Sequence, residues 1–125
     1  MNALRKLYKE LTSLHWEIGF LDNTFEGIVR GDKLKLTLVT HNFPNSWFAD
    51  PFILDVTDDT IIVLVEEVTK KISKGRISKL VIDRRNNYVI EKKVILERPG
   101  HLSFPIIYRK DDKIYVYPEN SEDGV

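Results

Sequence analysis

The pattern of apolar and polar residues divides the chain into a short helical stretch and a long series of strands. Four leucines recur at spacings of three and four near the N-terminus: Leu4, Leu7, Leu11 and Leu14. With charged residues between them, this spacing predicts one amphipathic helix over residues 2–15. Further along the chain the period becomes that of strands. We therefore expect an all-β protein preceded by one helix.

The segment of residues 16–46 is expected to be a β-rich lead-in. Phe25–Arg30 is predicted to be a short strand, and Gly31 comes after it as a turn residue. Leucine then alternates with polar residues over residues 34–38, which predicts a half-buried strand. A polar loop over residues 41–46 separates this lead-in from the remainder of the chain.

Four strands are predicted in close succession after this loop. They are separated by polar breaks of hairpin length, so we expect an antiparallel meander. The predicted strands are Pro51–Leu54, Thr60–Val68, Gly75–Ile82 and Tyr88–Leu96.

The chain also repeats itself. Pro51 and Pro105 lie 54 residues apart, and each stands at the predicted start of an apolar strand. In both copies an acidic turn comes next, and then a second strand that ends in glutamate, Glu66 in the first copy and Glu119 in the second. The alternative is two unrelated hairpins that use common turn residues.

A four-stranded unit that repeats near 50 residues has the period of a propeller blade. The first copy supplies one blade, about residues 51–96, and the second supplies two strands. We therefore predict a partial five-bladed β-propeller of about one and a half blades over residues 47–125. Residues 1–15 form the N-terminal helix in this division. Such a unit would be a homo-oligomer or part of a longer chain.

Composition and charge exclude several function classes. The 19 basic and 19 acidic residues cancel, which argues against a nucleic-acid partner. With no cysteine, the chain has no disulfide, thiol catalyst or cysteine-ligated zinc, and no motif indicates a metal or other cofactor. No apolar run is long enough to cross a membrane, and the N-terminus lacks the pattern of a secretory signal, so we expect a cytoplasmic location.

Six short motifs resemble one known family. They occur in the order Trp47–Phe52, Val65–Glu67, Lys74–Ser78, Val94–Pro99, His101–Pro105 and Tyr117–Asn120. Together they resemble the bacterial relatives of the N-terminal domain of glucosamine inositolphosphorylceramide transferase, over about residues 44–120. The resemblance implies a five-bladed propeller of the furanosidase-like group, which includes glycoside hydrolase families 43 and 32.

The resemblance also implies roles for individual residues. In the hydrolases of this group, an Asp-Pro pair in the first blade supplies the general base, and Asp50 matches it. A second Asp-Pro tunes this base, but Phe104 stands at that position here. Any activity would be hydrolysis of furanosides or xylosides. Without hydrolysis, the resemblance implies a carbohydrate-binding or scaffolding domain of a glycan-modifying transferase.

The carboxylates can also be considered from the strands alone. If residues 55–59 form the hairpin turn, Asp50 and Glu66 face each other across the ladder at one end. Two carboxylates this close repel each other, so one pKa should rise and the pair would share a proton or a cation. The corresponding residues of the second copy are Phe104 and Glu119. The alternative is that Asp50 caps a loop and Glu66 pairs with a lysine.

Three further residues are candidates for ligand binding, namely Trp47, His101 and Phe104. Trp47, like Trp16, offers a flat ring for a sugar or packs in the core instead. His101 precedes a strand and could bind a ligand hydroxyl. Three functions remain open: a carbohydrate-active propeller, a non-catalytic carbohydrate-binding or scaffolding domain, and a β-domain that binds a protein.

Overall fold

The computed structural model describes residues 3–4 and 15–122, and the predicted helix over residues 2–15 therefore lies almost entirely outside the described residues. The described part is mostly β-structure with one short helix, as the sequence predicts. Its elements are β1 (Gly19–Leu21), α2 (Phe25–Arg30), β2 (Leu36–Leu38), β3 (Ser46–Val56), β4 (Thr60–Thr69), β5 (Arg76–Asp83), β6 (Tyr88–Leu96), β7 (Ser103–Lys110) and β8 (Lys113–Glu119).

The strands form three separate antiparallel sheets. The central sheet has the order β3-β4-β5-β6, and β1-β2 and β7-β8 are two-stranded. The four predicted strands of the meander are thus confirmed, although β3 begins five residues before Pro51. Pro51 and Pro105 lie inside their strands rather than at the start, which corrects the prediction.

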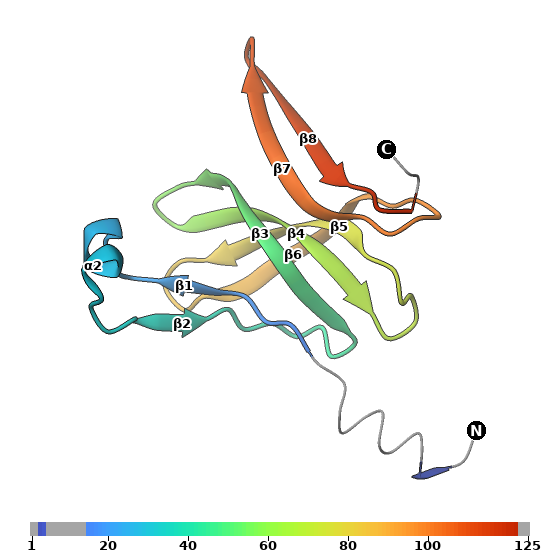
Figure 1. The fold of residues 1–125 in the computed structure, drawn as a ribbon, viewed down its shortest axis with the longest axis horizontal. Coiled ribbons are helices and arrows are strands. Elements are labelled where there is room, and N and C mark those ends of the chain that lie inside the picture. Colours follow the sequence, from blue (N-terminus) through green and yellow to red (C-terminus); the bar gives the residue numbers. More distant parts are fainter. Residues whose placement is uncertain (1–2, 5–14, 123–125) are drawn as a thin grey trace.

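The central sheet is covered on both faces. On one face Phe48, Val63 and Leu80 pack with Ile18 and Val39 from the segments next to β1 and β2. On the other face Leu64 and Ile77 pack with residues of the hairpin β7–β8 and the segment before it: Leu102, Ile107 and Val116. Figure 1 shows this hairpin rising from one side of the sheet, with β1, α2 and β2 at the other.

The lead-in differs from the prediction in two ways. Phe25–Arg30 is a helix, because the Thr24 side chain caps its N-terminus and Gly31 ends it with a φ of 86°. The strand at residues 34–38 is shorter than expected and is exposed rather than half-buried, since β2 pairs with β1 and the described residues leave its leucines uncovered.

The internal repeat is visible in the backbone. Ala49 pairs with Glu66 in the first copy, and Ser103 pairs with Glu119 in the second. Both ladders then shift register, and the next residue after each pair, Asp50 or Phe104, has the same positive φ of 49°. The two copies therefore share this bulge, the pairing on either side of it and the backbone conformation at its first residue, which accidental similarity of two hairpins does not explain. The first copy has a second register shift, between Ile53 and Asp55, that the second copy lacks.

Candidate functional site

Asp50 projects from a β-bulge. The pairing of β3 with β4 steps from Ala49 opposite Glu66 to Phe52 opposite Leu64, so Asp50 and Pro51 together oppose one residue of β4. The prediction that Asp50 begins its strand and lies directly opposite Glu66 is therefore wrong. The two side chains nevertheless meet, since the bulge leaves the Asp50 carboxyl within hydrogen-bonding reach of Glu66.

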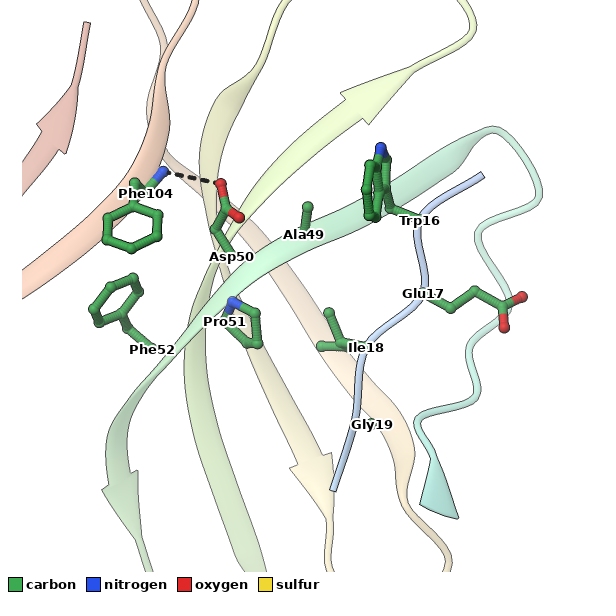
Figure 2. A pocket seen from close by; sticks show the side chains of 9 residues that line it. All are labelled: Trp16, Glu17, Ile18, Gly19, Ala49, Asp50, Pro51, Phe52 and Phe104. Atoms are coloured by element: carbon green, nitrogen blue, oxygen red, sulfur yellow. Dashed lines mark hydrogen bonds between the residues drawn. The ribbon is translucent and has the colours of Figure 1, made fainter. Parts of the chain in front are cut away.

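A pocket of about 490 Å³ lies beside this bulge. Figure 2 shows that it is built from three separate segments, the one preceding β1, the middle of β3 and the start of β7. Its lining residues are Trp16, Glu17, Ile18, Gly19, Ala49, Asp50, Pro51, Phe52 and Phe104. Asp50 and Phe104 are predicted site residues, and the pocket joins them to the exposed indole of Trp16.

Two aromatic rings and the Asp50 carboxylate meet where the repeats join. The rings of Phe52 and Phe104 pack edge to face, with centroids 5.1 Å apart. The backbone N–H of Phe104 donates a hydrogen bond of 3.3 Å to Oδ2 of Asp50 (Figure 2). The carboxylate is thus held at the seam between β3 and β7, on the pocket wall.

Glu66 and His101 contact each other and are not among the residues that line the pocket. His101 Nε2 is 3.1 Å from Glu66 Oε1, and the backbone N–H of Gly75 donates to His101 Nδ1 at 3.0 Å. The pKa of Glu66 is raised to about 7. Burial is the largest cause, and the neighbouring Asp50 carboxyl raises this pKa further. The predicted rise in the pKa of one member of this carboxyl pair is therefore found, and it falls on Glu66.

Gly75 leaves no room for a side chain at this point. A Cβ there would lie 2.3 Å from the carbonyl oxygen of Leu102 and 2.6 Å from Glu66 Oε1. The backbone of Gly75 also accepts a hydrogen bond from the Leu102 N–H. The close approach of two backbone segments therefore fixes His101 against Glu66.

The other two predicted site residues lie away from this pocket. Glu119 is exposed, and its carboxylate accepts a hydrogen bond of 3.5 Å from Ser103. The ring of Trp47 packs against that of His15 in a tilted arrangement, with centroids 4.8 Å apart, and Trp47 is not among the lining residues. The structure thus brings together Asp50, Glu66, His101 and Phe104. The tryptophan that lines the pocket is Trp16 rather than the predicted Trp47.

A fully buried glutamate next to this site is absent from the sequence-based candidates. Glu67 is 0 % exposed and contacts Lys92 and Arg76, the latter at 3.2 Å. It also accepts hydrogen bonds from Ser78 at 2.6 Å and from Ser46 at 2.8 Å. Burial opposes ionisation, but these four partners outweigh it and hold the pKa of Glu67 at about 2.

The burial of Glu67 has a signal in the sequence. It comes after Val63 and Val65 at a spacing of two, so all three side chains lie on one face of β4. Both valines belong to the core on that face. The alternation alone therefore places Glu67 inward, where a carboxylate needs cationic partners.

The described part of the chain shows no group of three or more histidine and acidic side chains that could hold a metal ion. None of its helices is long and apolar enough to cross a membrane.

The register-matched repeats, the covered central sheet and the aromatic pocket at the seam define an all-β repeat domain with a candidate ligand site. Residues 35–125 match the family model described as glucosamine inositolphosphorylceramide transferase 1, N-terminal. The match covers well over half of the chain, which therefore belongs to this family. Comparison with curated proteins and with solved structures gave no match.

Proposed function

We propose that the chain is part of a carbohydrate-binding domain that serves a glycan-modifying transferase and does not itself catalyse hydrolysis. The observation that carries this proposal is the pocket in which the Asp50 carboxylate lies among Trp16, Phe52 and Phe104. Aromatic rings pack against the apolar faces of sugars, and a few placed polar groups fix orientation in such sites. The description of the family supports a role with glycans.

The proposed architecture is a partial five-bladed propeller of the furanosidase-like group. The repeat spacing of 54 residues and the coverage of both faces of the central sheet are what a blade between two neighbours requires. In this arrangement β3 and β7 are successive innermost strands, and the pocket lies where they meet.

A hydrolase acting on furanosides or xylosides is the second candidate, and Asp50 would be its general base. Phe104 stands where the resemblance places the tuning acid, and its ring packs on Phe52 instead. A carboxyl pair does exist, but Glu66 contacts His101 and is not among the residues that line the pocket. Glycosidases instead place their two carboxyl groups on either side of the scissile bond. We therefore favour binding over hydrolysis.

The two tryptophans of the chain make the binding test direct. The variant Trp47→Phe fluoresces from Trp16 alone, and Trp16→Phe fluoresces from Trp47 alone. Oligosaccharides selected on a glycan array should change the emission of Trp47→Phe in a saturable way and leave Trp16→Phe unchanged. Phe104→Ala should weaken the binding. Equal responses from both single-tryptophan proteins, or binding unaffected by Phe104→Ala, would contradict the proposed site.

Hydrolysis is tested separately with aryl arabinofuranosides and xylosides. We expect no turnover above that of a buffer blank. Turnover that is abolished by Asp50→Asn would establish the second candidate instead.

A further inference from the structure

One continuous line of polar contacts runs from the backbone of Gly75, just before β5, to the wall of the pocket. It begins at the Gly75 N–H, passes through His101 and Glu66, and reaches Asp50. The Phe104 N–H closes it from the other side by donating to Asp50. Each contact joins a different segment of the chain, and the directions of donation can be assigned one after another.

The two ends of the line are fixed by backbone groups. A backbone N–H can only donate, so Nδ1 of His101 accepts from Gly75 and carries no proton. The hydrogen of the imidazole therefore lies on Nε2 and points at Glu66 Oε1, which accepts it. At the other end, Asp50 Oδ2 accepts from the Phe104 N–H.

These directions leave one proton to place between the two carboxyl groups. Two ionised carboxylates within hydrogen-bonding reach repel each other, and a single proton between them converts the repulsion into a hydrogen bond. Glu66 is the deeper group, because its side chain is 12 % exposed while Asp50 lines the open pocket. Burial disfavours charge, so the proton belongs to Glu66.

We propose that Glu66 is a neutral hydrogen-bond donor to Asp50, that His101 is its positioning residue, and that the pocket presents one negative charge and selects neutral hydroxyl-bearing ligands over cations. In its ligand class this inference rests on the proposed carbohydrate function. Its assignment of the proton does not depend on that function, because the assignment is argued from the contacts and the burial of Glu66.

The surroundings of Glu66 support this assignment. Titratable groups face it from two segments, Asp50 on β3 and His101 before β7. On β5 it is opposed by the apolar Ile77. Burial together with Asp50 raises the pKa of Glu66 to about 7.

A single ionised carboxylate has a clear consequence for recognition. With one oxygen bonded to the Phe104 N–H, Asp50 retains lone pairs that can accept hydroxyl hydrogens of a ligand. Two ionised carboxylates among aromatic rings would instead favour an ammonium group through charge and cation–π attraction. The position of one proton thus decides which ligand class the pocket prefers.

The protonation of Glu66 is tested by carbon-13 NMR of the glutamate side-chain carboxyls. The Glu66 signal is assigned by its absence in Glu66→Gln. In the native protein this signal should titrate near neutrality. In Asp50→Asn it should move toward the ordinary pKa of 4.5, because the repulsion is removed and an amide donor replaces the carboxylate. Asparagine also tolerates the positive φ of this position. The matched control is Glu119→Gln, which changes the equivalent residue of the second repeat and should leave the Glu66 titration unchanged.

Ligand class is tested with tetramethylammonium as a cationic probe, followed through Trp16 in Trp47→Phe. We expect no saturable response. A Glu66 signal that titrates in the ordinary carboxyl range in both proteins, or saturable tetramethylammonium binding lost in Asp50→Asn, would overturn the proposal. Failure of oligosaccharides to bind would overturn the carbohydrate function and leave the NMR result standing.

Discussion

Asp50 and Phe104 occupy the same position in two copies of one repeat, and the carboxylate of the first accepts a hydrogen bond from the backbone of the second. Both residues have a φ of 49°, and the bond measures 3.3 Å. The bulge that characterises each copy therefore also joins the copies. The candidate site lies at this junction because the bulges turn these side chains toward the seam.

The first prediction concerns the stability of the protein as pH rises. The pKa of Glu66 in the folded protein, about 7, lies above its ordinary value of 4.5, so the folded state holds this proton more tightly. The resulting stability is fully present below pH 4.5 and is lost as pH rises through about 7. Glu66→Gln keeps the shape and both hydrogen bonds without the ionisation. Relative to this variant, the free energy of unfolding of the native protein should fall by about 1–3 kcal/mol across the window.

Denaturant unfolding at pH values on either side of the window measures this difference. A parallel pH dependence of the native protein and Glu66→Gln would show that Glu66 is not protonated preferentially in the folded state.

The second prediction concerns the buried carboxylate of Glu67. Glu67→Gln leaves Lys92 and Arg76 facing a neutral amide and should lower the free energy of unfolding by about 3 kcal/mol. The matched control is Glu97→Gln, which removes the exposed carboxylate on the other side of Arg76 and should cost less than about 1 kcal/mol. Equal losses from the two variants would mean that burial at Glu67 does not matter.

The same residue predicts the behaviour of the protein in acid. The pKa of Glu67 is lowered to about 2, so its contribution is present above pH 4.5 and is lost as pH falls toward 2. Acid unfolding of the native protein should therefore be steeper than that of Glu67→Gln in this range, as circular dichroism can monitor.

The third prediction concerns the approach of two backbone segments at Gly75. Gly75→Ala places a methyl group against the Leu102 carbonyl and the Glu66 carboxyl and should destabilise the protein by at least about 1–3 kcal/mol. Gly100→Ala is the control, because the nearest atom to its Cβ is the side-chain oxygen of Asn120 at 3.2 Å, which can move. Thermal unfolding of both variants decides the matter, and a larger loss at Gly100 would contradict it.

The fourth prediction concerns the outer face of the hairpin β7–β8. The exposed residues on this face are Ile106, Tyr108, Tyr115 and Tyr117. In the first repeat, the equivalent positions of β3 and β4 form the face that packs against this hairpin. An apolar face of this kind favours association, so the 125-residue chain should form dimers or larger assemblies. Tyr117→Lys should weaken them, while Val29→Lys, on the exposed helix α2, should not. A single 14.6 kDa species at all concentrations in sedimentation equilibrium would refute this prediction.

The strands of the repeat can be predicted from the sequence because their evidence is local. Apolar residues and polar turns mark each strand between Thr60 and Leu96 within a few positions. The helix α2 cannot be predicted in this way, since six residues are too few to show a helical period. The capping residues Thr24 and Gly31 determine that this segment is a helix. The sequence pattern makes Gly31 the turn after a strand, whereas in the structure it ends a helix.

The sequence predicts several members of the candidate site but not its geometry. A repeated pattern around proline draws attention to Asp50, yet the alternation of residues along β3 does not reveal its bulges. Phe48 and Leu54 are an even number of residues apart, but the register shifts place them in the cores on opposite faces of the sheet. The contact between His101 and Glu66 depends on the segment at Gly75, 26 residues away from His101 along the chain. Trp16 reaches the pocket from the lead-in, and no spacing in the sequence indicates that.

The backbone at Phe104 carries an energetic cost that the backbone at Asp50 largely avoids. A left-handed conformation is tolerated by aspartate, asparagine and glycine, whereas for a bulky aromatic residue it costs about 1 kcal/mol or more. Phe104→Asn should therefore raise the melting temperature while it removes the ring that contacts Phe52. The second repeat thus carries backbone strain at the position where the first repeat largely avoids it, and the strained residue is one whose ring lines the pocket.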